Sequence, residues 1–88
     1  MVSTVGGMSA RVVVYTREGC GLCRAAEEAA ATVAAARGES VVTVDVDTDP
    51  ELVAAHGARV PVVAVDGDEV GEFVVDEATI AKALDTAR

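Results

Sequence analysis

The order of the first two apolar runs constrains the fold of this 88-residue chain more than any other feature. The run RVVVYT (residues 11–16) is uninterrupted, a pattern typical of a strand that is covered on both faces and central in its sheet. Residues 22–37 are mostly strong helix formers and stop at Gly38, as a helix C-terminus does. A second β-branched run, SVVTVDV, follows at residues 40–46. A strand, a helix and a strand joined by short links predict a right-handed parallel crossover.

A short second helix is indicated by the stretch DPELVAAHG. Asp49 is suited to the N-cap, Pro50 to the first helical position and Gly57 to the end of this helix. Residues 58–60 should form a loop. The sole histidine, His56, falls at the C-terminal end, where its charge would be favourable against the helix dipole.

A hairpin is predicted next. The runs PVVAV (residues 61–65) and EVGEFVV (residues 69–75) flank the dipeptide Asp66-Gly67. Because this dipeptide suits a type I′ turn, the two strands should be antiparallel.

Asp76 then caps a last amphipathic helix, in which Ile80 and Leu84 face inward and at whose end Arg88 lies. The complete order is β-α-β-α-β-β-α, which predicts an α/β domain with a four-stranded mixed sheet. The length allows one domain, and we assign it to residues 10–88, with residues 1–9 as a flexible tail.

The composition excludes several classes of function. Fifteen acidic against seven basic residues give a formal charge of -8, and no Lys/Arg cluster is present to neutralise phosphates, so we expect no nucleic-acid partner. The start of the chain lacks the apolar run of a secretory signal, and no segment approaches the roughly 18 apolar residues of a membrane span. We therefore expect a cytoplasmic protein without a membrane partner, in a compartment where thiols stay reduced.

The two cysteines, Cys20 and Cys23, allow three interpretations. A structural staple is disfavoured because a bridge between positions three apart constrains the unfolded chain only weakly. A metal site is disfavoured because about four ligands are needed and the only histidine lies far along the chain. The third interpretation is a dithiol that cycles with its disulfide, and it requires neither metal nor cofactor.

The position of Cys20 favours this redox chemistry. It lies at the start of the first helix, where backbone N–H groups and the helix dipole should bring the pKa of its thiol below the usual value of about 8.5. Cys23, one turn later, should point inward and act as the resolving thiol. Gly21 leaves the backbone around Cys20 open, and Leu22 can cover the pair. Arg17 and Arg24 could lend positive charge to the thiolate, and Glu18 would oppose them.

The strand, the C-x-x-C that opens a helix and the Val60-Pro61 before a hairpin resemble the glutaredoxin branch of the thioredoxin fold. More narrowly, YTREGCGLCRAAEEA and VDVDTDPELVAAHGARVPVVAVDGDEVG resemble small bacterial glutaredoxin-like proteins of the C-x-L-C type. The resemblance implies a thiol-disulfide oxidoreductase and a cis-proline at Pro61. It also implies that the backbone of Val60 pairs with an extended substrate and that Arg17 assists the thiolate and a glutathione carboxylate.

Two departures from the glutaredoxin pattern bear on glutathione. Gly21 and Leu22 stand where a proline and an aromatic residue are usual between the cysteines. Gly71 stands at the site that cradles the γ-glutamyl carboxylate, but Glu72 follows it in place of a second glycine and would repel that ligand. The expected substrates are protein or low-molecular-weight disulfides, and glutathione and thioredoxin reductase both remain candidate reductants. We expect a monomer. The alternative functions are a dimeric iron-sulfur or zinc binding module, or a redox-sensing, partner-binding domain without turnover.

Overall fold

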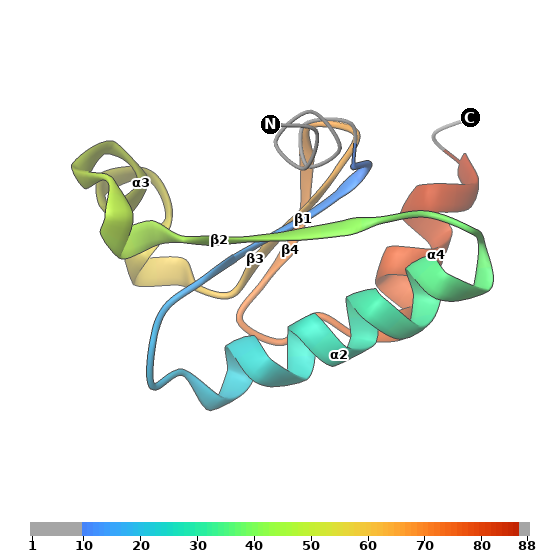
Figure 1. The fold of residues 1–88 in the computed structure, drawn as a ribbon, viewed down its shortest axis with the longest axis horizontal. Helices are drawn as coiled ribbons and strands as arrows, with labels where there is room; N and C mark the ends of the chain where they lie inside the picture. Colours follow the sequence, from blue (N-terminus) through green and yellow to red (C-terminus); the bar gives the residue numbers. More distant parts are fainter. Residues whose placement is uncertain (1–9, 87–88) are drawn as a thin grey trace.

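The structure is a computed structural model that describes residues 10–86. Within this range the regular elements are β1 (Val12–Thr16), α2 (Gly21–Ala36), β2 (Val41–Asp45), α3 (Pro50–His56), β3 (Val62–Val65), β4 (Asp68–Glu72) and α4 (Glu77–Thr86), with 3₁₀ turns η1 (Val46–Thr48) and η2 (Gly57–Arg59). The predicted order β-α-β-α-β-β-α is confirmed (Figure 1). The tail proposed at residues 1–9 and the helix end proposed at Arg88 lie outside the described residues.

The four strands form one mixed sheet in the order β2-β1-β3-β4. Strand β1 is parallel to β2, with Tyr15 opposite Val44, and antiparallel to β3, with Tyr15 opposite Val62. The parallel crossover, the antiparallel hairpin and the central place of β1 are therefore as predicted. In the turn of the hairpin, Asp66 and Gly67 have φ angles of 53° and 89°, as a type I′ turn requires.

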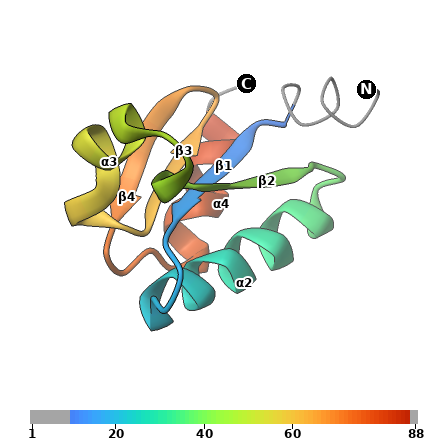
Figure 2. The same cartoon turned by 60° about the vertical axis from the view of Figure 1, so that its left-hand side comes forward.

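Helices α2 and α4 pack together against one face of the sheet (Figure 1), and the short helix α3 lies away from them, beside the hairpin strands (Figure 2). Val12 and Val14 of β1 face α2 and α4 and are fully buried, whereas Val13 and Tyr15 on the other face are only half-buried. The prediction that both faces of β1 are covered is thus only partly right, because one short helix cannot cover the second face. The main core consists of Val12, Val14, Ala26, Ala30, Val33, Val63, Val65, Val75, Ile80 and Leu84.

The inner face of helix α2 is built mostly from small residues. Ala26, Ala30 and Ala34 are all buried there. The helix ends as predicted at Gly38, whose φ of 69° is left-handed, and the N–H of Glu39 returns to the carbonyl of Ala34 at 2.9 Å. No helix among residues 10–86 is long and apolar enough to cross a membrane.

One strand end and one predicted loop differ from the sequence prediction. Strand β4 ends at Glu72 rather than at Val75, because the chain turns at Phe73 (φ 64°) and directs Val75 into the core. Helix α3 ends at His56 with Gly57 as its C-cap, as predicted. Gly57 has a φ of -55° and continues into η2, which replaces most of the predicted loop at residues 58–60.

Gly57 is close-packed in this 3₁₀ turn. A Cβ atom there would lie 3.2 Å from Cγ1 of Val53. Glycine is therefore favoured at this position by the lack of space and not by its φ angle.

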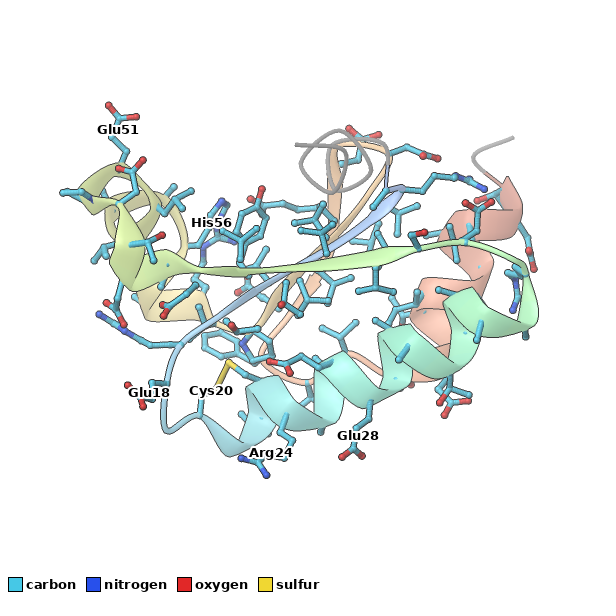
Figure 3. The ribbon with its side chains drawn as sticks, in the orientation of Figure 1. Glu18, Cys20, Arg24, Glu28, Glu51 and His56 are labelled. Carbon is cyan, nitrogen blue, oxygen red and sulfur yellow. A yellow bond between two sulfur atoms is a disulfide. The ribbon has the colours of Figure 1, made fainter. Side chains whose placement is uncertain are left out.

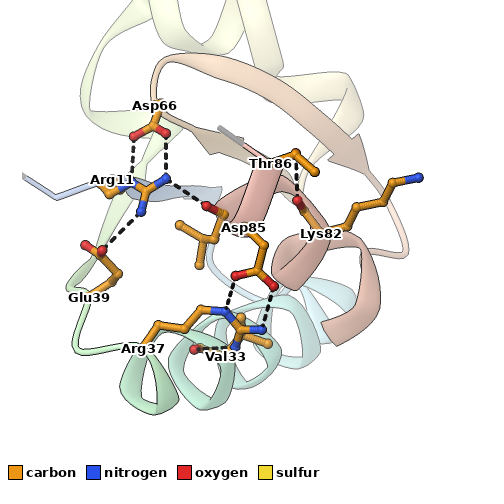
Figure 4. Close-up of polar contacts among 9 residues, drawn as sticks. Arg11, Val33, Arg37, Glu39, Asp66, Lys82, Asp85 and Thr86 are labelled. Carbon is orange, nitrogen blue, oxygen red and sulfur yellow. Dashed lines mark hydrogen bonds and ion pairs between the residues drawn. The ribbon is translucent and has the colours of Figure 1, made fainter. Parts of the chain in front are cut away.

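The end of the sheet where β1 begins is held by an arginine cluster (Figure 4). The guanidinium of Arg11 donates two hydrogen bonds of 2.9 Å to Asp66, one of 3.1 Å to Glu39 and one of 3.0 Å to the carbonyl of Leu84. These contacts connect the start of β1 with the hairpin turn, the α2–β2 loop and the end of α4. Arg37 similarly joins α2 to Asp85 of α4, at 2.9 and 3.1 Å.

Candidate active site at the start of helix α2

The opposite end of the sheet brings together segments that are distant in the sequence. Tyr15 of β1 is opposite Val62 of β3, which is opposite Glu72 of β4. The loop from β1 to α2, the residue before β3 and the residue after β4 therefore meet at one end of the molecule. The backbone N–H of Phe73 closes this arrangement by donating to the carbonyl of Pro61 at 2.9 Å.

Cys20 and Cys23 form a disulfide at this end, with their Cα atoms 5.2 Å apart (Figure 3). Cys20 is the N-cap of α2, and its Sγ accepts the N–H of Cys23 at 3.0 Å. Cys23 is 2% exposed, whereas Cys20 is partly exposed. The sequence-based expectation that Cys23 is the less exposed of the two cysteines is confirmed.

The local electrostatics suit an anionic sulfur at Cys20. The first turn of the 16-residue helix α2 contains no acidic residue, so its backbone N–H groups are not used by a carboxylate of that turn. When the disulfide is reduced, the N–H of Cys23 is positioned to donate to a thiolate at Cys20. A helix N-terminus stabilises negative charge, which lowers the pKa of a thiol there.

An open cleft lies beside the dithiol. It is lined by Thr16, Arg17, Glu18, Gly19, Cys20, Gly21, Cys23, Arg24, Glu27, Glu28, Ala31 and Asp45. Of the residues that the sequence proposed for substrate binding, Arg17 and Gly21 therefore lie next to the cysteines. Glu27 is half-buried and belongs to this cleft.

Arg17 is held by a partner that sequence reasoning missed. Its guanidinium donates to both carboxylate oxygens of Asp47, at 3.0 and 2.8 Å, and to the carbonyl of Gly57 at 3.2 Å. The hydrogen bonds raise the pKa of Arg17 and lower the pKa of Asp47. Arg17 thus lines the cleft of the dithiol, but Asp47 compensates its charge.

The other proposed substrate-binding residues do not line this cleft. The Val60-Pro61 peptide bond is cis, as the resemblance implied, with Pro61 buried and Val60 half-buried. Leu22 is 47% exposed in the first turn of α2. Gly71 lies in β4 opposite Val63, where a Cβ atom would stand 3.0 Å from Cγ2 of Val75, so its role in the structure is close packing.

A second arginine cluster, also missed from the sequence, lies directly before Val60. Arg59 donates to Glu69 at 3.0 and 3.3 Å, to Glu72 at 2.8 Å and to the carbonyl of Ala55 at 2.7 Å. These hydrogen bonds raise the pKa of Arg59 and lower the pKa of Glu69. The carboxylate of Glu72, predicted to repel an anionic ligand, is therefore already paired.

His56 belongs to the same cluster. Its Nδ1 is 3.2 Å from Nη2 of Arg59 and 3.5 Å from Oε2 of Glu69, and its ring stacks on Tyr15 with 4.2 Å between centroids. Within residues 10–86 no three histidine, cysteine or carboxylate side chains are grouped so that they could hold a metal ion.

Comparisons with known proteins agree with this geometry. The family described as Glutaredoxin-like domain (DUF836) matches residues 11–85. The Mycobacterium tuberculosis protein named "Uncharacterized protein Rv0508" is 38% identical over 72 residues, which cover 76% of this chain and 74% of that protein.

Two solved structures are similar to the whole domain. Protein XcR50 from X. campestris has a TM-score of 0.73 at 33% identity, covering 88% of this chain and 99% of its own. A mutant thioredoxin from Halobacterium salinarum has a TM-score of 0.58 at 31% identity, covering 88% and 74%. With its Cys20–Cys23 disulfide and its mixed four-stranded sheet, this chain has a thioredoxin-like fold and belongs to the glutaredoxin-like domain (DUF836) family.

Proposed function

We propose that the protein is a thiol-disulfide oxidoreductase that reduces disulfides through Cys20 and Cys23. The observation that carries this proposal is the unequal exposure of the two cysteines at one helix start, with Cys20 partly exposed and its Sγ accepting the N–H of Cys23. An accessible sulfur can meet a substrate, and a buried neighbour can displace it. Family membership supports the same chemistry.

In the first step the thiolate of reduced Cys20 attacks one sulfur of the substrate disulfide. The substrate S–S bond breaks as the bond to Cys20 forms, and the departing thiolate takes a proton from water. The product is a mixed disulfide between Cys20 and the remaining half of the substrate.

In the second step Cys23 loses its proton and attacks Sγ of Cys20. The mixed disulfide breaks, the second half of the substrate leaves as a thiolate, and the Cys20–Cys23 disulfide forms. Two electrons have then passed from the protein dithiol to the substrate. A reductant restores the dithiol, and the candidates are glutathione and thioredoxin reductase.

The surrounding residues would position the substrate. Val60 lies just outside β3, where its backbone N–H and carbonyl could pair with an extended substrate chain beside Pro61. Gly21 leaves room next to Cys20, since nothing lies within 4 Å of a Cβ atom built there, and Leu22 would contact the substrate. We propose that the protein acts as a monomer in the cytoplasm, where a thiol pool keeps the dithiol reduced.

Single-cysteine variants test this division of roles. Cys20→Ser should abolish disulfide reduction. Cys23→Ser should still attack and should accumulate a mixed disulfide that is visible by mass spectrometry. The proposal is wrong if Cys23 of the reduced protein is alkylated before Cys20 near neutral pH, or if Cys23→Ser forms no mixed disulfide.

A further inference from the structure

Carboxylates outnumber cations around the dithiol. The cleft beside Cys20 is lined by two guanidinium groups, those of Arg17 and Arg24, and by four carboxylates, those of Glu18, Glu27, Glu28 and Asp45. Glu18 and Glu28 are exposed and come from the two sides of Cys20, one from the loop before it and one from helix α2 (Figure 3). A substrate bound in this cleft therefore lies near more carboxylates than guanidinium groups.

Most of the positive charge nearby is already compensated. Arg17 is paired with Asp47, which adds a further carboxylate next to the cleft. Beyond Pro61, Arg59 is shared between Glu69 and Glu72. Arg24 takes part in no ion pair among residues 10–86. An anionic substrate therefore finds one uncompensated guanidinium group at this end of the molecule.

The same end also carries the exposed apolar side chains. Leu22, Phe73 and Val74 are 47%, 45% and 77% exposed, and they are the exposed large hydrophobic residues of the described chain. Leu22 separates the two cysteines, and Phe73 is hydrogen-bonded to the carbonyl of Pro61. Leu22 therefore lies at the start of α2, and Phe73 and Val74 directly follow β4, in segments that meet at this end of the sheet. Apolar surface exposed beside a reactive group is typical of a site that contacts another macromolecule. A small disulfide would leave most of this surface uncovered.

On the basis of the proposed function, we infer that the preferred substrate is a disulfide carried by a protein segment with lysine or arginine next to its cysteine. Leu22, Phe73 and Val74 would contact the apolar part of this segment, and Glu18 and Glu28 would attract its positive charge. The same two carboxylates would disfavour small anionic disulfides such as oxidised glutathione. The net charge of -8 acts in the same direction at long range.

Two peptides with the same disulfide test the inference. Each carries one cysteine linked to the same reporter thiol, and they differ only in two lysines or two glutamates beside that cysteine. Electrostatic steering changes association rates by about 10- to 1,000-fold, so the lysine peptide should be reduced at least about tenfold faster at low salt. The ratio should approach one near 1 M salt, where the Debye length falls to about 3 Å.

Charge-neutralising variants locate the effect. Glu18→Gln combined with Glu28→Gln should lower the ratio of the two rates several-fold. The matched control combines Glu51→Gln with Asp68→Asn, which removes the same charge from exposed positions away from the cleft; Glu51 is far from Cys20 in Figure 3. The control should keep most of the ratio.

Two small disulfides complete the experiment. Oxidised glutathione should be reduced more slowly than the lysine peptide, and so should cystamine, which is cationic but lacks a peptide chain. Equal rates for the two peptides, or faster reduction of the glutamate peptide or of oxidised glutathione, would overturn the charge preference. If cystamine were reduced as fast as the lysine peptide, the inference that the substrate is a protein segment would be wrong. If no disulfide is reduced and Cys23→Ser traps none, the proposed function itself fails.

Discussion

Phe73 donates its backbone N–H to the carbonyl of Pro61 over 2.9 Å while its own φ is 64°, in the left-handed region. A bulky L-residue with this φ places Cβ close to its own carbonyl oxygen, at a cost of about 1–2 kcal/mol. The conformation persists because the hydrogen bond fixes the end of β4 beside the start of β3, and because Val75 must turn into the core.

Replacing Phe73 tests this backbone conformation. Phe73→Gly and Phe73→Ala both remove the ring, but only glycine adopts a positive φ without strain. We expect Phe73→Gly to be about 1 kcal/mol more stable than Phe73→Ala in urea unfolding. The control is Ala31→Gly on the exposed face of α2, which should lose about 1 kcal/mol because glycine is unfavourable in a helix. Equal stability of the two Phe73 variants would contradict the strained conformation.

Gly71→Ala tests whether Gly71 is needed for close packing. Because the new Cβ would lie 3.0 Å from Cγ2 of the buried Val75, we expect the free energy of unfolding to fall by about 1–3 kcal/mol. Gly21→Ala is the matched variant, since a Cβ there meets nothing within 4 Å at the first position of α2, and its stability should be equal or higher. Denaturant unfolding measures both. If Gly21→Ala lost stability and Gly71→Ala kept it, Gly71 would not be the close-packed glycine and Gly21 would not be the open one.

The features that could be predicted from the sequence are local. Asp49 and Pro50 start α3, Asp66-Gly67 makes the hairpin turn, and Cys20 begins α2, because each signal acts within a few residues of itself. The end of β4 was predicted wrongly because the run EVGEFVV contains no break in the sequence, while Val75 is buried in a core that includes Ile80 and Leu84 of α4.

The ion pairs could not be predicted, because their partners are brought together only by the fold. Arg17 and Asp47 are 30 positions apart, and Arg11 and Asp66 are 55 apart. With fifteen acidic residues available, the sequence does not specify which one each arginine meets. The role predicted for Arg17 assumed a free positive charge, but Asp47 compensates it. The repulsion predicted for Glu72 assumed a free negative charge, but Arg59 compensates it.

Arg11 should contribute more to stability than Arg37. The Arg11 side chain is 19% exposed and connects four segments, whereas Arg37 is 29% exposed and pairs with an Asp85 that is 59% exposed. Exposed pairs contribute little because water and ions screen them. We expect Arg11→Ala to lower the melting temperature clearly more than Arg37→Ala, as measured by thermal unfolding at moderate salt. An equal decrease for the two variants would show that the Arg11 cluster does not act as a unit.

The N-cap of α4 predicts a pH dependence. Hydrogen bonds from the side chain and backbone of Thr79 lower the pKa of Asp76 below its usual 3.8. A carboxyl group whose pKa is lowered by folding stabilises the protein above its unfolded pKa, and this contribution is lost as the pH falls through the folded pKa. Asp76→Asn should therefore be less stable than the parent protein at pH 7 and should approach it below about pH 4.

Urea unfolding between pH 7 and pH 3 measures this difference. Asp68→Asn is the control, because its side chain makes no hydrogen bond among residues 10–86, and its difference from the parent should not depend on pH in the same way. A constant difference between Asp76→Asn and the parent over the whole range would contradict the cap.

Asp47 should control how far Arg17 supports the thiolate of Cys20. Arg17 lines the dithiol cleft and is held there by a bidentate ion pair with Asp47. Asp47→Asn should therefore leave Arg17 with its charge and without this carboxylate partner. A nearby positive charge favours a thiolate, and close opposite charges shift a pKa by about 1–3 units. We therefore expect the pKa of Cys20 to be lower in Asp47→Asn than in the parent protein.

The rate of iodoacetamide alkylation as a function of pH measures this pKa in a Cys23→Ser background, where Cys20 is the remaining cysteine. Asp68→Asn removes the same charge at the far end of the hairpin and should leave the midpoint almost unchanged, which separates a local effect from a change in net charge. Adding Arg17→Ala to Asp47→Asn should bring the midpoint back toward its original value, because the cation is then gone. If Asp47→Asn lowers the midpoint equally with and without Arg17, the loss of the carboxylate alone explains the shift, and Arg17 has no part in activating Cys20.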